Sequence, residues 1–135
     1  MDEFGRSSLH NACIGLGYSR SESIATINKA AVSGSDIDAT DFGGWTALHF
    51  ASQNSDAELC ELLLKAGAMV DPVETYGNTP LWRAVMNCRG DGDCIKVLRL
   101  YGADPYLENK SGISPLSLAR SIGNYDVAQH FADLR

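Results

Sequence analysis

The chain has 135 residues, of which 44% are hydrophobic and 21% are charged, as is typical of one folded domain. It holds 17 acidic residues against 11 Lys and Arg, so its formal net charge is −6 at pH 7. This balance disfavours binding to nucleic acid or to an anionic membrane, both of which need a basic surface. It suits a protein partner that presents a basic face.

The first residues are acidic and contain no apolar run, and no stretch of about 18 apolar residues follows. We therefore expect neither a secretory signal peptide nor a membrane span. Four cysteines without an export signal are expected to be reduced thiols. These features together predict a cytoplasmic protein.

An internal repeat organises the chain, because four similar hexapeptides occur, each with a glycine two residues before it. They begin at Ser7, Thr46, Thr79 and Ser114. The leucine at the third position of each recurs after steps of 39, 33 and 35 residues. A second landmark, a leucine-rich string ending in Gly-Ala at residues 63–68 and 98–103, follows in the middle units. We therefore divide the chain into four units.

The first unit, about residues 2–40, is predicted to begin with a helix that carries Leu9, Ala12, Cys13 and Leu16 on one face. Six extra residues fall within 15–22, between its two helices. We expect them to form a loop, since insertions in repeats collect as loops on one face, often the binding face.

The second unit, about 41–73, has Thr46 as the N-cap of its first helix. Its second helix is predicted from Leu59, Leu62 and Leu63, which share one apolar face, and from Gly67, which suits a helix end.

The third unit, about 74–108, and the fourth, about 109–135, place proline directly after the capping Thr79 and Ser114, where a missing N–H costs little. Two extra residues of the third unit fall within 87–93. The fourth unit ends on apolar residues separated by polar ones, as suits a terminal cap with one solvated face.

The hexapeptides resemble the T-P-L-H-x-A signature of ankyrin repeats, whose period is 33 residues. The third copy keeps Thr79, Pro80, Leu81 and Ala84, and the first two keep the histidine. The resemblance covers nearly the whole chain. It implies one all-α domain, residues 1–135, built as an ankyrin-repeat solenoid of four stacked helix-turn-helix units with β-turn fingers.

The same resemblance assigns His10 and His49 as hydrogen-bonding struts between neighbouring turns rather than as catalytic bases. Trp82 and Ser117 stand where the family has this histidine, so we expect no such strut from the third repeat onward. Trp82 is predicted to fill space between repeats.

Ankyrin proteins bind partners with their finger tips and concave inner helices, and this implies a binding surface here. The candidate partner-binding residues are Phe42, Trp45, Tyr76, Asn78, Gln53, Asn54, Arg83, Met86, Asn87, Arg89, Asp91 and Ile113. We place the first four on or near finger tips, where aromatic residues suit an interface. Trp45→Ala is expected to weaken binding and to leave stability almost unchanged. For Phe50 and Met86, contact with a partner and packing against the neighbouring repeat are equally favoured roles.

No catalytic motif occurs: the sequence has no GxSxG, HExxH, Walker loop or GxGxxG. We therefore predict no enzyme, no cofactor and no bound metal. Cys13 and Cys60 are expected in the core. Cys88 and Cys94 flank the inserted turn, where a disulfide is geometrically feasible, although two free thiols are favoured in the cytoplasm.

A narrower resemblance concerns function. The strings at residues 77–85, 89–92, 112–116 and 124–127 are similar to those of short standalone bacterial ankyrin proteins, which look like immunity partners of toxins. This favours a protein, monomeric when free, that binds and occludes a basic toxin domain such as a nuclease. Alternatives are a general ankyrin scaffold or regulatory adaptor, or a small enzyme or ligand-binding protein. Residues 1–76 carry a charge of −7 and 77–135 carry +1, so the first two repeats should attract a basic partner most.

Overall fold

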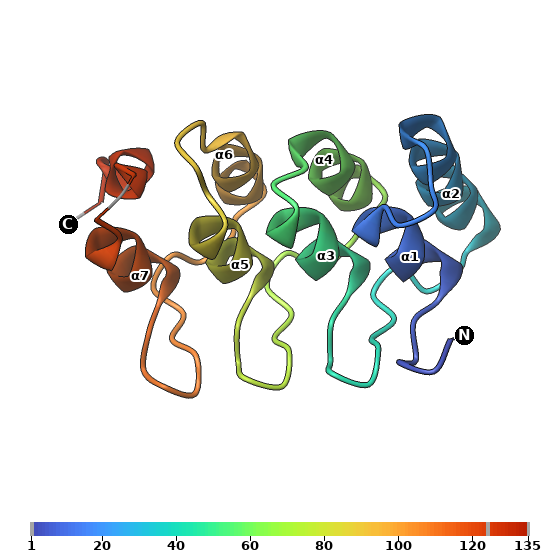
Figure 1. Cartoon of the computed structure of the whole chain (residues 1–135), viewed down its shortest axis with the longest axis horizontal. Coiled ribbons are helices and arrows are strands. Elements are labelled where there is room, and N and C mark those ends of the chain that lie inside the picture. Colours follow the sequence, from blue (N-terminus) through green and yellow to red (C-terminus); the bar gives the residue numbers. More distant parts are fainter. Residues whose placement is uncertain (1, 124, 135) are drawn as a thin grey trace.

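The protein forms two layers of short helices, shown in Figure 1 as a computed structural model in which residues 2–123 and 125–134 are described. In chain order the helices of these residues are α1 (Ser8–Ile14), α2 (Arg20–Ser33), α3 (Ala47–Gln53), α4 (Ala57–Lys65), α5 (Pro80–Met86), α6 (Asp93–Leu100), α7 (Pro115–Ser121) and the 3₁₀ helix η1 (Val127–Phe131). The described part contains no β-strand. The predicted all-α ankyrin solenoid is confirmed, while the repeat bounds given above stay predictions.

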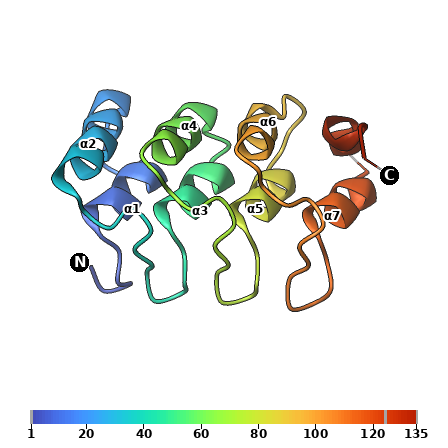
Figure 2. The same cartoon turned by 180° about the vertical axis from the view of Figure 1, so that it is seen from behind.

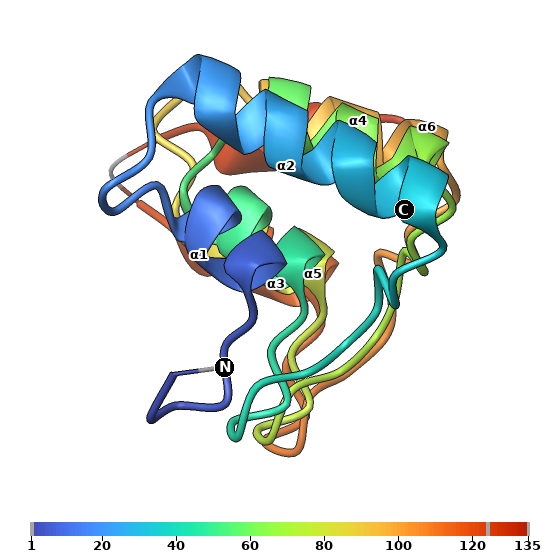
Figure 3. The ribbon, with the colours of Figure 1, turned by 90° about the vertical axis from the view of Figure 1, so that its right-hand side faces the viewer.

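The odd-numbered helices form an inner row, and α2, α4, α6 and η1 form an outer row that lies above it in both views (Figures 1 and 2). Before α1 and between successive units the chain forms a turn that projects from the helices, here called a finger. Viewed along the stack, the fingers lie over one another and project away from both helical rows (Figure 3). We call the surface made by the fingers and the exposed sides of the inner helices the finger face.

Each inner helix starts at a capping residue, as predicted for Thr46, Thr79 and Ser114, because a Ser or Thr side chain accepts a hydrogen bond from the main-chain N–H three residues later. The caps are Ser7, Thr46, Thr79 and Ser114. Pro80 and Pro115 occupy the first helical position as predicted. The hexapeptide thus fixes where each inner helix begins.

The histidine struts are confirmed in the first two units. His10 Nε2 lies 2.9 Å from the carbonyl oxygen of Trp45, and His49 Nε2 lies 2.9 Å from that of Asn78. Each Nδ1 accepts the N–H of its own capping residue, Ser7 or Thr46. The rings are therefore neutral, with the proton on Nε2 donated to the next unit.

This strut stops after the second unit, as predicted. The indole nitrogen of Trp82 is buried and has no hydrogen-bond partner among the described residues. Among the described residues, the Ser117 hydroxyl bonds only to its own cap, Ser114. The third and fourth units are joined instead by apolar packing, by their fingers and by side-chain hydrogen bonds of Arg99 and His130.

The core runs between the two helical rows. Leu48, Leu81 and Leu63 are fully or almost fully buried, and Cys13 and Cys60 lie in the core as predicted. All four cysteines are free and buried. The sulfur of Cys94 lies 3.1 Å from that of Cys60 in the preceding unit, so the closest thiol partner of Cys94 is not Cys88 across the inserted turn.

One prediction for the first unit is wrong, and another is confirmed only in part. Helix α1 ends at Ile14, since Gly15 adopts a left-handed conformation, and Leu16 beyond it is 86% exposed rather than on the apolar face. Residues 15–19 form the predicted loop, but residues 20–22 belong to α2, which has 14 residues against nine in α4 and eight in α6. The insertion in the third unit does form a loop, between Met86 and Asp93.

The last unit closes the stack with η1 in place of a full helix. Val127 and Phe131 are buried, and Arg99 of α6 donates to the carbonyl oxygen of His130 and to both carboxylate oxygens of Asp133. These bonds fasten the chain end to the third unit. Within 2–123 and 125–134, no helix combines the length and apolarity needed to cross a membrane.

Candidate protein-binding surface

The four fingers share one turn design. The first residue of each turn accepts, through one side-chain oxygen, the main-chain N–H groups two and four residues later. These residues are Asp2, Asp41, Glu74 and Asn109. The fourth position is always glycine, with φ between 76° and 81°, a left-handed conformation that other residues adopt at a cost. The finger tips are therefore held in one conformation.

Neighbouring fingers are joined by main-chain hydrogen bonds. The N–H groups of Phe42, Thr75 and Lys110 donate to the carbonyl oxygens of Phe4, Gly43 and Tyr76, at 2.9, 3.0 and 3.1 Å respectively. In each pair, the second residue of one turn donates to the third residue of the preceding turn. The spacing of the side chains that project from the fingers is thus set by the backbone.

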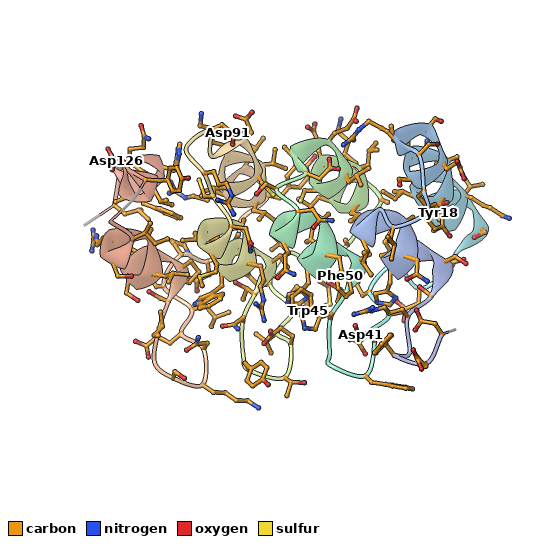
Figure 4. All side chains as sticks on the ribbon, viewed as in Figure 1. Tyr18, Asp41, Trp45, Phe50, Asp91 and Asp126 are labelled. Carbon is orange, nitrogen blue, oxygen red and sulfur yellow. The ribbon has the colours of Figure 1, made fainter. Side chains whose placement is uncertain are left out.

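An alternating series of aromatic rings and arginines runs along the base of the first three fingers; we call it the aromatic–arginine stack. It consists of Phe4, Arg6, Phe50, Trp45, Arg83 and Trp82. Trp45 stacks on Phe50 at 4.8 Å between ring centroids, and the Arg83 guanidinium lies 4.3 Å from the Trp45 ring. Figure 4 shows Trp45 and Phe50 where the fingers meet the inner helices. Such contacts are stronger where water is excluded.

Arg83 is fixed in this stack by Glu74. One carboxylate oxygen of Glu74 accepts the N–H groups of Tyr76 and Asn78, and the other forms an ion pair with Arg83. The Glu74 side chain is fully buried and that of Arg83 is 17% exposed. Burial alone would raise the pKa of Glu74, but Arg83 and the N–H donors hold it below its ordinary value. The pair is therefore charged and structural.

Two hollows open on or beside the finger face. The first groove, about 380 Å³, is lined by Glu3, Phe4, Arg6, Asp41, Phe42, Gly43, Trp45, Phe50 and Gln53. The second, about 370 Å³, lies at the turns between inner and outer helices and is lined by Gln53, Asn54, Ser55, Asn87, Arg89 and Asp91. The second hollow brings together five of the predicted partner-binding residues.

The predicted residues differ in how much side chain they present. Phe42 is 75% and Tyr76 68% exposed, and the remaining exposed members are Met86, Ile113, Asn54, Arg89 and Asp91. Gln53, Asn87, Arg83 and Trp45 are half-buried. Met86 is thus free to meet a partner, whereas Phe50 is buried in the stack.

Asn78 does not lie at an exposed tip, and that expectation is wrong. Its side chain is 4% exposed and donates to Glu74, while its oxygen accepts from the Asn109 amide. It joins the bases of two fingers. Asn54 also has an internal role, because its amide donates to the carbonyl oxygens of Cys13 and Ile14 at the end of α1.

Sequence reasoning missed the first finger, residues 2–6, and with it Glu3, Phe4 and Arg6. The signal was present, because Gly5 precedes the first hexapeptide by two residues, as Gly44 precedes the second. Aligning the two turns places Phe4 and Arg6 beside the second finger. No cluster of three metal-binding side chains occurs among residues 2–123 and 125–134.

Comparison with known proteins agrees with this architecture. A family model described as "Ankyrin repeats (3 copies)" matches residues 9–109. The chain is similar to the B-cell lymphoma 3 protein homolog of Mus musculus, with 34% identity over 126 residues, covering 91% of this chain and 27% of that protein.

Two further relatives match shorter segments. The ADP-ribosylation factor GTPase-activating protein AGD2 of Arabidopsis thaliana is 38% identical over 59% of this chain and 10% of its own length. The putative ankyrin repeat protein FPV031 of fowlpox virus is 36% identical over 62% of this chain and 26% of its own length. The chain thus spans about a tenth to a quarter of these relatives. With its stacked units and matching family model, the chain belongs to the ankyrin-repeat family.

Proposed function

We propose that this chain is a non-enzymatic module that binds a basic partner protein through its finger face. Ankyrin repeats are protein-interaction modules, and the observation that carries the proposal is the pair of aromatic side chains, Phe42 and Tyr76, held out on rigid fingers. Exposed aromatic residues on a pre-organised surface are typical of binding hot spots, since little conformational entropy is lost when they are covered.

Charge supports the basic nature of the partner. Residues 1–76, which include the first two fingers, carry −7 and the rest carry +1. A basic partner would be drawn to the first two units, with the charge acting more on the association rate than on affinity. The buried, free thiols suit a reducing compartment such as the cytoplasm, and we propose a free monomer without cofactor.

The proposal is tested with paired variants in quantitative capture from cell extract. Phe42→Ala with Tyr76→Ala removes two exposed rings from the finger face. Val32→Ala with Leu100→Ala removes two exposed apolar side chains from the outer row as a control. A partner bound through the finger face is retained by the wild type and by the control and is lost by the finger variant. Retention by the finger variant refutes the proposal.

As a narrower form, we propose that the partner is a toxin domain whose active site is occluded. Its support is the similarity of four short strings to those of standalone bacterial ankyrin proteins, together with the acidic first half. The relatives named above come from an animal, a plant and a virus and add nothing to this form. Co-expression with the product of the adjacent gene tests it: that product must be toxic alone, harmless with this chain, and must co-purify with it.

A general scaffold or regulatory adaptor is the second candidate. The observation that favours it is that the matching segment makes up a tenth to a quarter of the relatives, where it is one part among others. A neighbouring product that is harmless alone, combined with a partner lost by the finger variant, would select this candidate.

A further inference from the structure

The first groove already holds a cation, the guanidinium of Arg6. Its central carbon lies 4.6 Å from the centre of the Phe4 ring and 5.2 Å from that of Phe50. The Asp41 carboxylate approaches Arg6 Nε to 3.6 Å. Two aromatic faces and a carboxylate form a site of the kind that attracts a planar cation.

Arg6 is held much less firmly than Arg83, the other arginine of the stack. Arg83 donates to the fully buried Glu74, whereas the 3.6 Å ion pair of Arg6 with Asp41 is longer than a hydrogen bond. The Nε atoms of both arginines lack a hydrogen bond within the described part of the chain, so the two side chains differ in their carboxylate contacts and in their exposure. The Arg6 side chain is 30% exposed against 17% for Arg83. Arg6 can therefore leave its place at lower cost.

The groove is lined by more negative charge than Arg6 neutralises. Glu3 and Asp41 both line it, against one arginine, and Glu3 forms no ion pair within 4.0 Å among the described residues. Phe42 adds a third aromatic wall, because its ring leans over Gly5, where a Cβ would come within 2.6 Å. Residues 1–76 supply a further negative field.

We propose that the first groove is the subsite for an arginine side chain of the basic partner. The incoming guanidinium stacks among Phe4, Phe42 and Phe50 and pairs with Asp41 and Glu3, while Arg6 swings toward solvent. Arginine fits better than lysine because its planar cation is weakly hydrated and stacks on aromatic rings, as Arg6 itself does. This inference rests on the proposed function and specifies one side chain of the partner, an arginine, and the groove that binds it.

The probe is the blocked tripeptide Gly-Arg-Gly, titrated into ¹⁵N-labelled protein and followed by NMR. The expected result is saturable shifts at the amides of Phe42 and Gly43 and at the Trp45 indole. The same tripeptide with citrulline, which keeps the shape and lacks the charge, should produce shifts several-fold smaller. Equal shifts for both tripeptides, or shifts confined to other surfaces, overturn the proposal.

Two variants sharpen the test. Arg6→Gln empties the site and should tighten binding of the arginine tripeptide several-fold. Arg20→Gln makes the same charge change outside the groove, where Arg20 pairs with Asp56 and Glu58, and should tighten it far less. Phe42→Ala, at a side chain too exposed to be needed for folding, should weaken binding several-fold. Weaker binding by Arg6→Gln, or equal effects of the two arginine variants, overturns the proposal.

Failure here is distinguishable from failure of the proposed function. If the finger variant loses a captured partner while the tripeptide does not bind in the groove, the finger face is an interface and the arginine subsite is wrong. If the capture is unaffected by the finger variant, the proposed function itself is wrong.

Discussion

Acidification should destabilise the protein through His49, the strut between the second and third units. The imidazole is fully buried, Nδ1 accepts the Thr46 N–H at 3.1 Å and Nε2 donates to the Asn78 carbonyl at 2.9 Å. A second proton would have to bind at Nδ1, which already faces an N–H donor. Burial lowers the pKa of His49 from 6.5 to about 4, against opposing effects of the Asn78 carbonyl and Glu74.

The pKa difference fixes the sign and the pH window. Between pH 6.5 and 4 the unfolded chain binds the proton and the folded chain does not, so the free energy of unfolding falls as the pH falls. The contribution is fully present above the unfolded pKa and is lost as the pH falls to the folded pKa. Between pH 7 and 5 the loss amounts to about 2 kcal/mol, with a slope of at most about 1.4 kcal/mol per pH unit.

Urea unfolding followed by circular dichroism at pH 7, 6 and 5 measures this loss, with His49→Gln as the control. Glutamine can still donate to the Asn78 carbonyl but does not titrate, so the wild type should lose about 2 kcal/mol more than the variant over this range. The comparison cancels the other histidines and the carboxylates, because both proteins contain them. Equal losses in both proteins, or an NMR titration of His49 near pH 6.5, would refute the reasoning.

Three further predictions follow from burial. Leu81→Ala should lower the free energy of unfolding by about 2–5 kcal/mol, because Leu81 is fully buried; a loss below 1 kcal/mol would place it outside the core. Trp45→Ala should cost about 1–3 kcal/mol, since the ring packs on Phe50 and Arg83, and an unchanged melting temperature would show that these contacts add nothing. All four thiols are buried, and they should resist a disulfide reagent in the native protein and react once it is unfolded. Burial, aided by Cys60 and Asp56, also raises the pKa of the Cys13 thiol to about 12. Fewer than four reacting thiols in the unfolded protein would reveal a disulfide.

Trp45 shows how much of the structure could be predicted from the sequence. Its place next to a finger follows from the repeat, but the expectation that its removal would spare stability is revised by the structure. The ring is half-buried because Phe50 from α3 and Arg83 from the next unit enclose it. Phe50 is only five residues away, but the contact with Arg83 joins residues of different units and leaves no local pattern in the sequence.

The start of a helix could be predicted where side chains within one turn determine it. Capping residues and prolines fix the start of each inner helix, because they act on main-chain groups within one turn. The end of α1 was missed, since the apolar spacing continued to Leu16 while Gly15 ended the helix. The length of α2 was also missed, because the Ser19 capping box starts the helix inside the predicted loop.

The finger face was predictable in outline and not in detail. Phe42 and Tyr76 are exposed as the repeat pattern indicated, whereas Asn78 turned inward. The reason lies in Glu74, whose longer side chain replaces the Asp or Asn of the other fingers and reaches both Asn78 and Arg83. Together with the Asn109 amide, which donates to the Asn78 side-chain oxygen, Glu74 holds Asn78 inward.

The central claim is that the finger face is where a partner binds, and site-specific photo-crosslinking tests it most directly. A benzophenone amino acid is placed at Tyr76 on the third finger or, in a matched protein, at Val32 on the outer row, both of which are exposed. The account predicts a crosslinked partner from position 76 and none from position 32. A partner that crosslinks from position 32 and not from position 76 would contradict it.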